Sequence, residues 1–340
     1  MAAQLKVDVG LVNVVATVTD QAGRYVSNLT ADDLIVEEDG QLQTISHFDQ
    51  SNDLPVSVGI VLDTSGSMER KIGTATSSVE RFIRNIHDDD DIFLMTFSER
   101  PSLRQDFTAD RDKLASALRR ITVGGGTALY DALEEGLRKV KKGMHDKKAI
   151  LLITDGEDTS SYATFDEASL SVRESELLVY CLGISPSSSG LFSERTPPTS
   201  RGPSGRRDPN GDPRIEIPGI PGIPGIPGNP RRRWPLVSSA LPQRTRGGGS
   251  SNPDTVDMKV LQAFADDSGG KAWLLSGNWT GNRGSEIQAV LDEIAAELRN
   301  QYSIGYYPSH PINDNKWHRI EIRAKNPKYH VRARKDYYGQ

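Results

Sequence analysis

The chain has 340 residues, of which 36% are hydrophobic and 26% are charged, with a net charge of -5. This length and composition are typical of a protein with a substantial hydrophobic core, and they exclude a short peptide or a polar tail. The small negative charge gives no overall attraction to nucleic acid, so we expect no nucleic-acid partner. A single cysteine, Cys181, excludes an intramolecular disulfide, and we expect its thiol to be packed in a buried strand.

The N-terminal segment, residues 5–50, predicts strands joined by turns. Its stretch VGLVNVVATVTD is rich in valine and threonine, which favour strands, and Asp39-Gly40 between two extended runs indicates a hairpin. The C-terminal segment, residues 301–339, returns to the same pattern. We expect the two segments to pair into one small β-sandwich. The alternative is an independent N-terminal module and a separate C-terminal extension.

The middle of the chain, residues 55–300, has a different pattern of apolar residues. Short apolar runs such as VSVGIVL and AILLIT alternate with segments in which apolar residues recur at helical spacing. This alternation predicts an α/β fold with a doubly wound, mostly parallel sheet that is covered by helices on both faces. We expect this domain to be inserted in the β-sandwich formed by the terminal segments.

Residues 185–255 interrupt the α/β pattern with a stretch rich in proline, glycine, serine and arginine. Nine arginines and three acidic residues lie between positions 201 and 250, which makes this stretch locally basic. Such a composition cannot bury enough apolar surface to fold, so we predict a disordered insert. A solvated loop is the simpler interpretation, and contact with an anionic polymer, with lipid headgroups or with the protein's own acidic surface is the alternative.

No apolar run reaches the roughly 18 residues that a membrane-spanning helix requires. The N-terminal stretch MAAQLKV has neither a basic start nor an apolar core. The sequence therefore predicts neither a transmembrane segment nor a signal peptide.

Polar side chains follow the first apolar strand of the middle segment, in the stretch IVLDTSGSM. Asp63, Ser65 and Ser67 occupy alternate positions, and Gly66 between the serines is expected to let the loop curl so that the three side chains converge. In a doubly wound sheet, ligands bind outside the carboxyl ends of the strands, which is where this loop lies. One carboxylate and two hydroxyls are hard oxygen donors, which suit Mg²⁺ better than zinc.

Three oxygen ligands are too few for Mg²⁺, which takes about six. Thr127 follows a glycine-rich turn that opens a helix, and Asp155 follows another buried strand, so both can add hard oxygen donors at the same edge. The resulting constellation comprises Asp63, Ser65, Ser67, Thr127 and Asp155.

These motifs resemble the von Willebrand factor A (VWA) domain: Asp-x-Ser-x-Ser after a strand, a threonine after a glycine-rich turn, and Thr-Asp-Gly after a second strand. The resemblance implies a Rossmann-like fold in which the five positions form a metal-ion-dependent adhesion site, with one coordination position open to a carboxylate of a partner protein. The flanking segments also resemble those of the acidobacterial VWFA-related proteins, although the arginine- and proline-rich insert is unusual for that family.

The function that this resemblance implies is cation-dependent, adhesion-type recognition of another protein, without enzymatic activity. The expected cofactor is Mg²⁺, or Mn²⁺ or Ca²⁺ in its place, and the expected partner supplies an aspartate or glutamate. The resemblance also favours a periplasmic, secreted or cell-surface location.

Two other functions stay open. A Mg²⁺-dependent phosphohydrolase-like enzyme would also place an aspartate after a strand, but such enzymes need a second carboxylate where Ser65 stands. A scaffold could bind the cation only to stabilise its loops.

Two further patterns favour no additional metal site. The Asp88–Asp91 run is expected to form a solvated turn rather than a second cation site. The histidines have no ligand spacing in the sequence, so no zinc site is predicted. They are His47, His87, His145, His310, His318 and His330.

Overall fold

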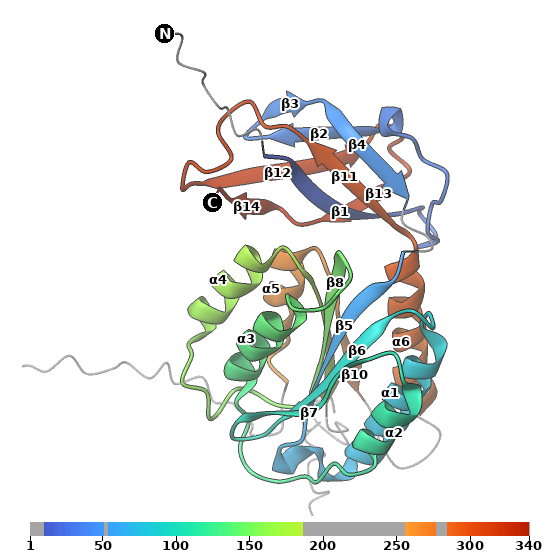
Figure 1. Ribbon diagram of the computed structural model, residues 1–340, viewed down its shortest axis with the longest axis vertical. Helices are drawn as coiled ribbons and strands as arrows, with labels where there is room; N and C mark the ends of the chain where they lie inside the picture. The colour runs from blue at the N-terminus through green and yellow to red at the C-terminus, as the bar shows by residue number, and fades with distance from the viewer. Residues whose placement is uncertain (1–9, 51–53, 186–255, 277–283, 340) are drawn as a thin grey trace, which may run out of the picture. The chain divides into compact units, whose positions relative to one another are not determined.

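The structure, a computed structural model of the chain, describes residues 10–50, 54–185, 256–276 and 284–339. Within these residues, one six-stranded sheet forms from the middle of the chain, and two four-stranded sheets form from its terminal segments (Figure 1). The predicted insert at 185–255 lies outside the described residues, apart from Ser185 at the end of a strand.

The six-stranded sheet has the order β10-β9-β8-β5-β6-β7. Its neighbouring strands are parallel, except that β7 runs antiparallel to β6. All eight residues of β5 are buried, as expected for a strand covered on both faces. The strands are β5 (Val56–Asp63), β6 (Asp91–Phe97), β7 (Pro101–Thr108), β8 (Lys147–Thr154), β9 (Leu178–Ser185) and β10 (Ala272–Ser276).

Helices cover both faces of this sheet (Figure 1). One buried cluster joins the sheet to α1, α2 and α6, and another joins it to α3, α4 and α5. The helices are α1 (Ile72–Asn85), α2 (Arg111–Leu118), α3 (Leu129–Val140), α4 (Phe165–Ser175), α5 (Met258–Ser268) and α6 (Gly284–Arg299). The predicted α/β fold with a mostly parallel central sheet is confirmed.

The order in which the chain adds strands to the sheet reverses next to β5. From β5 the chain adds β6 and β7 on one side, and it then returns to place β8 on the other side. The loops that follow β5 and β8 therefore diverge at the carboxyl edge of the sheet, which is the usual ligand-binding position in doubly wound folds. Asp63 ends β5 and Asp155 comes directly after β8, so both carboxylates lie at this edge.

The terminal segments form two antiparallel sheets with the orders β13-β1-β11-β4 and β14-β12-β2-β3. Buried side chains from both sheets, including Val14, Val36, Ile304 and Ile320, belong to one hydrophobic cluster. The strands are β1 (Val12–Thr19), β2 (Leu34–Glu38), β3 (Gln41–Gln43), β4 (Ile45–Gln50), β11 (Gln301–Tyr306), β12 (Trp317–Ala324), β13 (His330–Ala333) and β14 (Asp336–Tyr338).

Two further expectations from the sequence concern Cys181 and the Asp88–Asp91 run. Cys181 is fully buried in β9, as predicted. The solvated turn expected at Asp88–Asp91 is only half right, because Asp90 and Asp91 are buried. The Asp90 carboxylate accepts hydrogen bonds from the backbone N–H groups of Val56 (2.8 Å) and His87 (2.9 Å), so it fixes the entry into β5.

Within the described residues, no helix combines the length and the apolar character that crossing a membrane requires.

Candidate functional site

Asp63 is held rigidly at the end of β5 with its side chain fully buried. Its Oδ1 accepts a hydrogen bond from the backbone N–H of Ser65 (2.7 Å), and its Oδ2 accepts one from the hydroxyl of Thr154 (2.6 Å). Burial raises the pKa of Asp63 to about 6, although the Thr154 and Ser65 hydrogen bonds oppose this shift. A cation bound nearby would stabilise the ionised form of this buried carboxyl group, in competition with the proton.

The two serines continue from Asp63 into a short 3-10 helix, η2 (Gly66–Arg70). Their hydroxyl oxygens are 3.0 Å apart, and Ser67 donates a hydrogen bond to Oδ1 of Asp155 (2.7 Å). Since the Ser67 proton is directed to Asp155, Ser65 is the donor in the serine pair. The alternation of polar residues after β5 therefore brings Ser65 and Ser67 together, as predicted.

The expected role of Gly66 is wrong. Its φ is not among the positive values found at other glycines, and a Cβ at this position would lie 3.6 Å from the nearest atom, the carbonyl oxygen of Gly125. The positive φ values occur instead in the second loop, at Gly124 (152°) and Gly125 (86°). The loop that needs glycine is therefore the one before Thr127.

Thr127 is 5% exposed and lies at the start of the segment that leads into α3. Its backbone accepts hydrogen bonds from the N–H groups of Thr159 (2.8 Å) and Ser160 (3.0 Å), and its own N–H donates to Oγ1 of Thr159 (2.9 Å). A Cβ built on Gly156 would lie 3.6 Å from the Thr127 hydroxyl and 3.9 Å from the Ser67 hydroxyl. Both hydroxyls thus border the same small residue, and the glycine leaves the space between the loops open.

Asp155 joins two loops through its two oxygens. Oδ1 accepts the Ser67 hydrogen bond, and Oδ2 lies 2.5 Å from Nζ of Lys71. Lys71 and Asp155 are both buried, at 5% and 1% exposure. Hydrogen bonds therefore connect Asp63, Ser65, Ser67 and Asp155 at one edge of the sheet.

We use the name Asp63 site for Asp63, Ser65, Ser67, Thr127 and Asp155. All of its side-chain donors are oxygens, and all but Ser67 belong to buried residues. Its two carboxylates have one adjacent cation among the described residues, Lys71, so the described side chains favour a divalent ion electrostatically. The donor set fits Mg²⁺, Mn²⁺ or Ca²⁺ better than a metal that prefers nitrogen or sulfur.

Three supporting residues had no role in the sequence prediction of the site. Thr154 orients Asp63, and Lys71 pairs with Asp155. Asp158 accepts hydrogen bonds from the N–H of Leu129 (2.8 Å) and the hydroxyl of Ser161, so it ties the loop after β8 to the start of α3. An aspartate often accepts a hydrogen bond from a free N–H group at the start of a helix, and such residues normally directly precede that helix. Asp158 instead follows the start of α3 by about thirty positions, so the sequence did not reveal this role.

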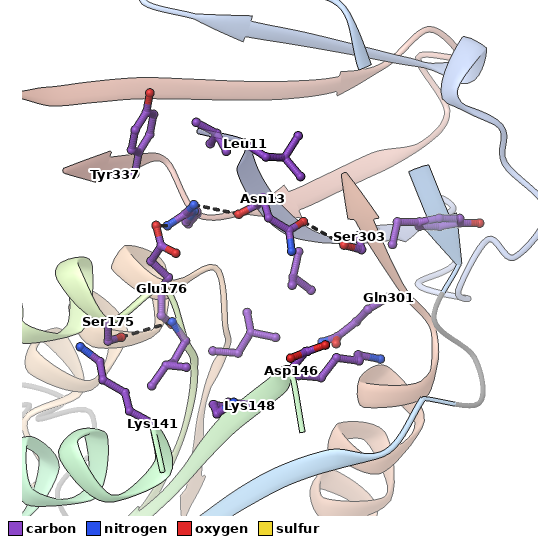
Figure 2. A pocket seen from close by; sticks show the side chains of 18 of the residues that line it. Leu11, Asn13, Lys141, Asp146, Lys148, Ser175, Glu176, Gln301, Ser303 and Tyr337 are labelled. Carbon is purple, nitrogen blue, oxygen red and sulfur yellow. Dashed lines mark hydrogen bonds and ion pairs between the residues drawn. The ribbon is translucent and has the colours of Figure 1, made fainter. Parts of the chain in front are cut away.

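A pocket of about 740 Å³ lies elsewhere, lined by residues of β1, β11 and the segment after α4 (Figure 2). Asn13 accepts hydrogen bonds there from Arg334 at its carbonyl (2.8 Å) and from Ser303 at its side chain (2.8 Å). None of the residues that line this pocket belongs to the Asp63 site. The chemistry at the strand ends is therefore separate from this hollow.

Comparison with known proteins gives one family match and several relatives. Residues 58–157 match the family described as the von Willebrand factor type A domain. A 114-residue stretch is 32% identical to "Uncharacterized protein sll0103" of Synechocystis sp., covering 32% of this chain and 27% of that protein. The chain thus matches only about a quarter of the length of this curated relative.

Solved structures are similar at lower identity. A von Willebrand factor type A protein from Catenulispora acidiphila is 13% identical, with a TM-score of 0.46, over 97% of this chain and 72% of its own. Proximal thread matrix protein 1 from the mussel byssus, with a zinc-occupied MIDAS motif, is 17% identical, with a TM-score of 0.36. The match covers 41% of this chain and 38% of that protein. The family match begins within β5, ends just after β8 and includes every residue of the Asp63 site, so the site lies in the part of the chain that is similar to von Willebrand factor A domains.

Proposed function

We propose that the VWA domain recognises another protein through a divalent cation bound at the Asp63 site. The observation that carries this proposal is the position of Ser67, which lies 3.0 Å from Ser65 and 2.7 Å from Asp155. A hydroxyl that joins the loops after β5 and β8 places oxygen donors from both loops around one point. Thr127 then adds a donor from a third loop.

The cation that fits this site is Mg²⁺, with Mn²⁺ or Ca²⁺ as substitutes, because the donors are carboxylates and hydroxyls. Asp63 and Asp155 supply two negative charges, one of which Asp155 shares with Lys71, so the bound ion leaves the site with a net positive charge. Hydroxyls and water complete most of the shell. An aspartate or glutamate of the partner protein would take the remaining position, where its charge gains most from the metal. The partner's affinity would then depend on the cation.

No enzymatic role is proposed. A phosphohydrolase-like mechanism requires a general acid or base two positions after Asp63, and Ser65 occupies that position. A purely structural cation stays as the alternative, and it predicts a different outcome for the experiment below.

The domain organisation that we propose has the VWA domain at 55–300, inserted in a β-sandwich formed by residues 5–50 and 301–339. Support comes from the pairing of β1 with β11 and from the single hydrophobic cluster shared by the two terminal sheets. The sandwich would present or anchor the recognition domain. The proposed location is periplasmic, secreted or on the cell surface, by resemblance to the VWFA-related proteins.

Calorimetric titration of the full chain with Mg²⁺ and with Mn²⁺ tests the metal site. We expect saturable binding to the unaltered protein, which Asp63→Ala and Ser67→Ala abolish or weaken by at least about tenfold, equivalent to 1.4 kcal/mol. The matched control is Ser77→Ala, since Ser77 is exposed on α1 and its hydroxyl donates to the carbonyl of Gly73 within the same helix. Absence of binding, or equal binding by Ser67→Ala and Ser77→Ala, contradicts the proposal.

Asp155→Ala distinguishes recognition from structural stabilisation. With a recognition site, a partner captured by the full chain should be lost on chelation and with Asp155→Ala, while circular dichroism shows an intact fold. With a structural cation, chelation should lower the melting temperature of the unaltered protein, and partner capture should survive in the folded fraction of Asp155→Ala. The melting temperature of Asp155→Ala itself is not the criterion, because this substitution leaves the buried Lys71 unpaired in either case.

A further inference from the structure

A second group of potential metal ligands lies in the terminal sheets. Glu38 ends β2, His318 is the second residue of β12, and His310 lies in the loop between β11 and β12. One ligand atom from each residue can be chosen so that all three atoms lie within 4.8 Å of one another. The sequence predicted no zinc site because the histidines lack ligand spacing, but the fold brings His310 and His318 together.

In both histidines, Nδ1 is engaged by an acceptor next to the group. Nδ1 of His318 is 2.8 Å from Oδ2 of Asp39, and Nδ1 of His310 is 3.0 Å from the carbonyl oxygen of Pro311. The two rings stack with their centroids 3.8 Å apart. A proton on each Nδ1 satisfies these acceptors, and Nε2 of His310 is then available to a metal, which is the usual arrangement of metal-bound histidine. Nε2 of His318 faces Oδ1 of Asp314 at 3.0 Å, so it would release its proton when it ligates the ion.

The carboxylate of Glu38 is buried at 2% exposure and is only partly satisfied. Its Oε1 accepts hydrogen bonds from the hydroxyls of Tyr337 (2.5 Å) and Tyr306 (3.3 Å). Among the described residues, its Oε2 and Nε2 of His310 are buried atoms without a hydrogen-bond partner. Because buried polar atoms are rarely left unpaired, an ion that both can ligate explains their position.

Asp314 adds a second carboxylate to the group. Its Oδ1 lies 3.0 Å from Nε2 of His318, and Nε2 of His310 lies 3.4 Å from Oε1 of Glu38. Ligands about 2.0 Å from a tetrahedral zinc ion are about 3.3 Å from each other, so these two separations already suit such a shell. The ligand atoms of Glu38, His310 and His318 lie up to 4.8 Å from one another, so they would move slightly closer together on binding.

We propose that this group, named here the His310 cluster, binds one divalent transition-metal ion of the zinc class. It comprises Glu38, His310, His318 and Asp314. Two imidazole nitrogens and two carboxylate oxygens form a donor set typical of zinc, in contrast to the all-oxygen Asp63 site. The ion would connect β2 of the N-terminal segment to β12 and the loop before it, and the partly exposed His310 provides its route of entry.

The experiment uses the full chain freed of metal by a chelator, then titrated with Zn²⁺ by calorimetry and with Co²⁺ by visible absorption. We expect one Co²⁺ ion with the intense absorption of tetrahedral coordination, displaced by Zn²⁺. His310→Ala should lower the affinity more than tenfold, and Asp39→Asn, which weakens the support of His318, by about 10- to 100-fold. The matched control is His47→Ala, an exposed histidine of β4 that should keep full binding.

Asp155→Ala distinguishes the two sites, because it alters the Asp63 site and not the His310 cluster. The tetrahedral Co²⁺ spectrum should therefore persist in this variant. Glu38→Gln should also lower the Co²⁺ affinity more than tenfold. If this variant fails to fold, His310→Ala still tests the proposal, since His310 is in a loop. The absence of a tetrahedral spectrum, equal binding by His310→Ala and His47→Ala, or loss of the signal in folded Asp155→Ala would each overturn the proposal.

Discussion

Nζ of Lys71 lies 2.5 Å from Oδ2 of Asp155, and both side chains are buried, at 7% and 0% exposure. Asp155 therefore already has a cationic partner on one oxygen, while Ser67 donates to the other. A metal ion at the Asp63 site would share this carboxylate with the lysine. The ammonium group thus lowers the electrostatic gain from binding a second cation nearby.

Lys71→Met should increase the Mg²⁺ affinity by about tenfold or more, because it removes a positive charge beside the site while keeping an unbranched side chain. The metal-free variant should lose about 3 kcal/mol of unfolding free energy, since Asp155 would be left buried and unpaired. Calorimetry and urea unfolding measure the two effects, with the exposed Lys113→Met as the control. An affinity equal to that of the unaltered protein would show that Lys71 does not compete with the ion.

Mg²⁺ binding should weaken as the pH falls below about 6. Burial raises the pKa of Asp63 from 3.8 to about 6, so below that pH a proton must leave before the metal can bind. The affinity should fall by about tenfold per pH unit, which calorimetry at several pH values measures. A flat profile across this range would mean that Asp63 does not ligate the ion.

The same pKa shift should make the metal-free protein less stable as the pH rises, whereas Mg²⁺ binding becomes stronger. Between pH 3.8 and about 6, the folded protein holds a proton on Asp63 that the unfolded chain has released. The Asp63 contribution to the unfolding free energy therefore decreases as the pH rises through this window. Urea unfolding with a chelator present, compared between the unaltered protein and Asp63→Asn, isolates this contribution.

Thr154→Val should destabilise the protein by about 1 to 2 kcal/mol and weaken Mg²⁺ binding. The substitution keeps the shape of the side chain but removes the hydrogen bond to Oδ2 of Asp63, which leaves a buried carboxylate less well satisfied. Urea unfolding and calorimetry provide the measurements. The exposed Thr44→Val serves as the control, and equal stability of the two variants would contradict the role given to Thr154.

Cys181 should not react with thiol reagents in the folded protein. The side chain is fully buried in β9, and burial raises the pKa of its thiol far above the ordinary value, so almost no reactive thiolate forms. Labelling should begin only with global unfolding, at a rate that urea increases. Rapid labelling without denaturant would show that β9 is exposed by local opening.

The general position of the Asp63 site could be predicted because it depends on local rules. Apolar runs identify β5 and β8, and parallel strands bring the residues after them to one edge of the sheet. The narrower resemblance to the acidobacterial VWFA-related proteins stays a prediction. The supporting residues depend on packing between loops: nothing in the sequence says that Thr154, still inside its strand, turns its hydroxyl to Asp63 on the neighbouring strand.

The His310 cluster, in contrast, could not be predicted from the sequence. Glu38 and His318 come from strands that pair antiparallel, with Glu38 beside Ile320, but they are separated by nearly the whole chain. Metal motifs are visible in a sequence when their ligands share one helix or loop. Ligands that meet only through pairing between the first and last segments have no such signature.

That pairing also affects the order in which the protein can fold during synthesis. Strand β1, at Val12–Thr19, pairs with Gln301–Tyr306 on one edge and His330–Ala333 on the other. The ribosome therefore releases the partners of β1 only after nearly all of the central sheet has emerged. Contacts this distant in sequence form slowly, and a valine-rich strand waiting for them exposes two open edges. The nascent chain is most exposed to aggregation in this interval, when its first strand is complete and its last strands have not been made.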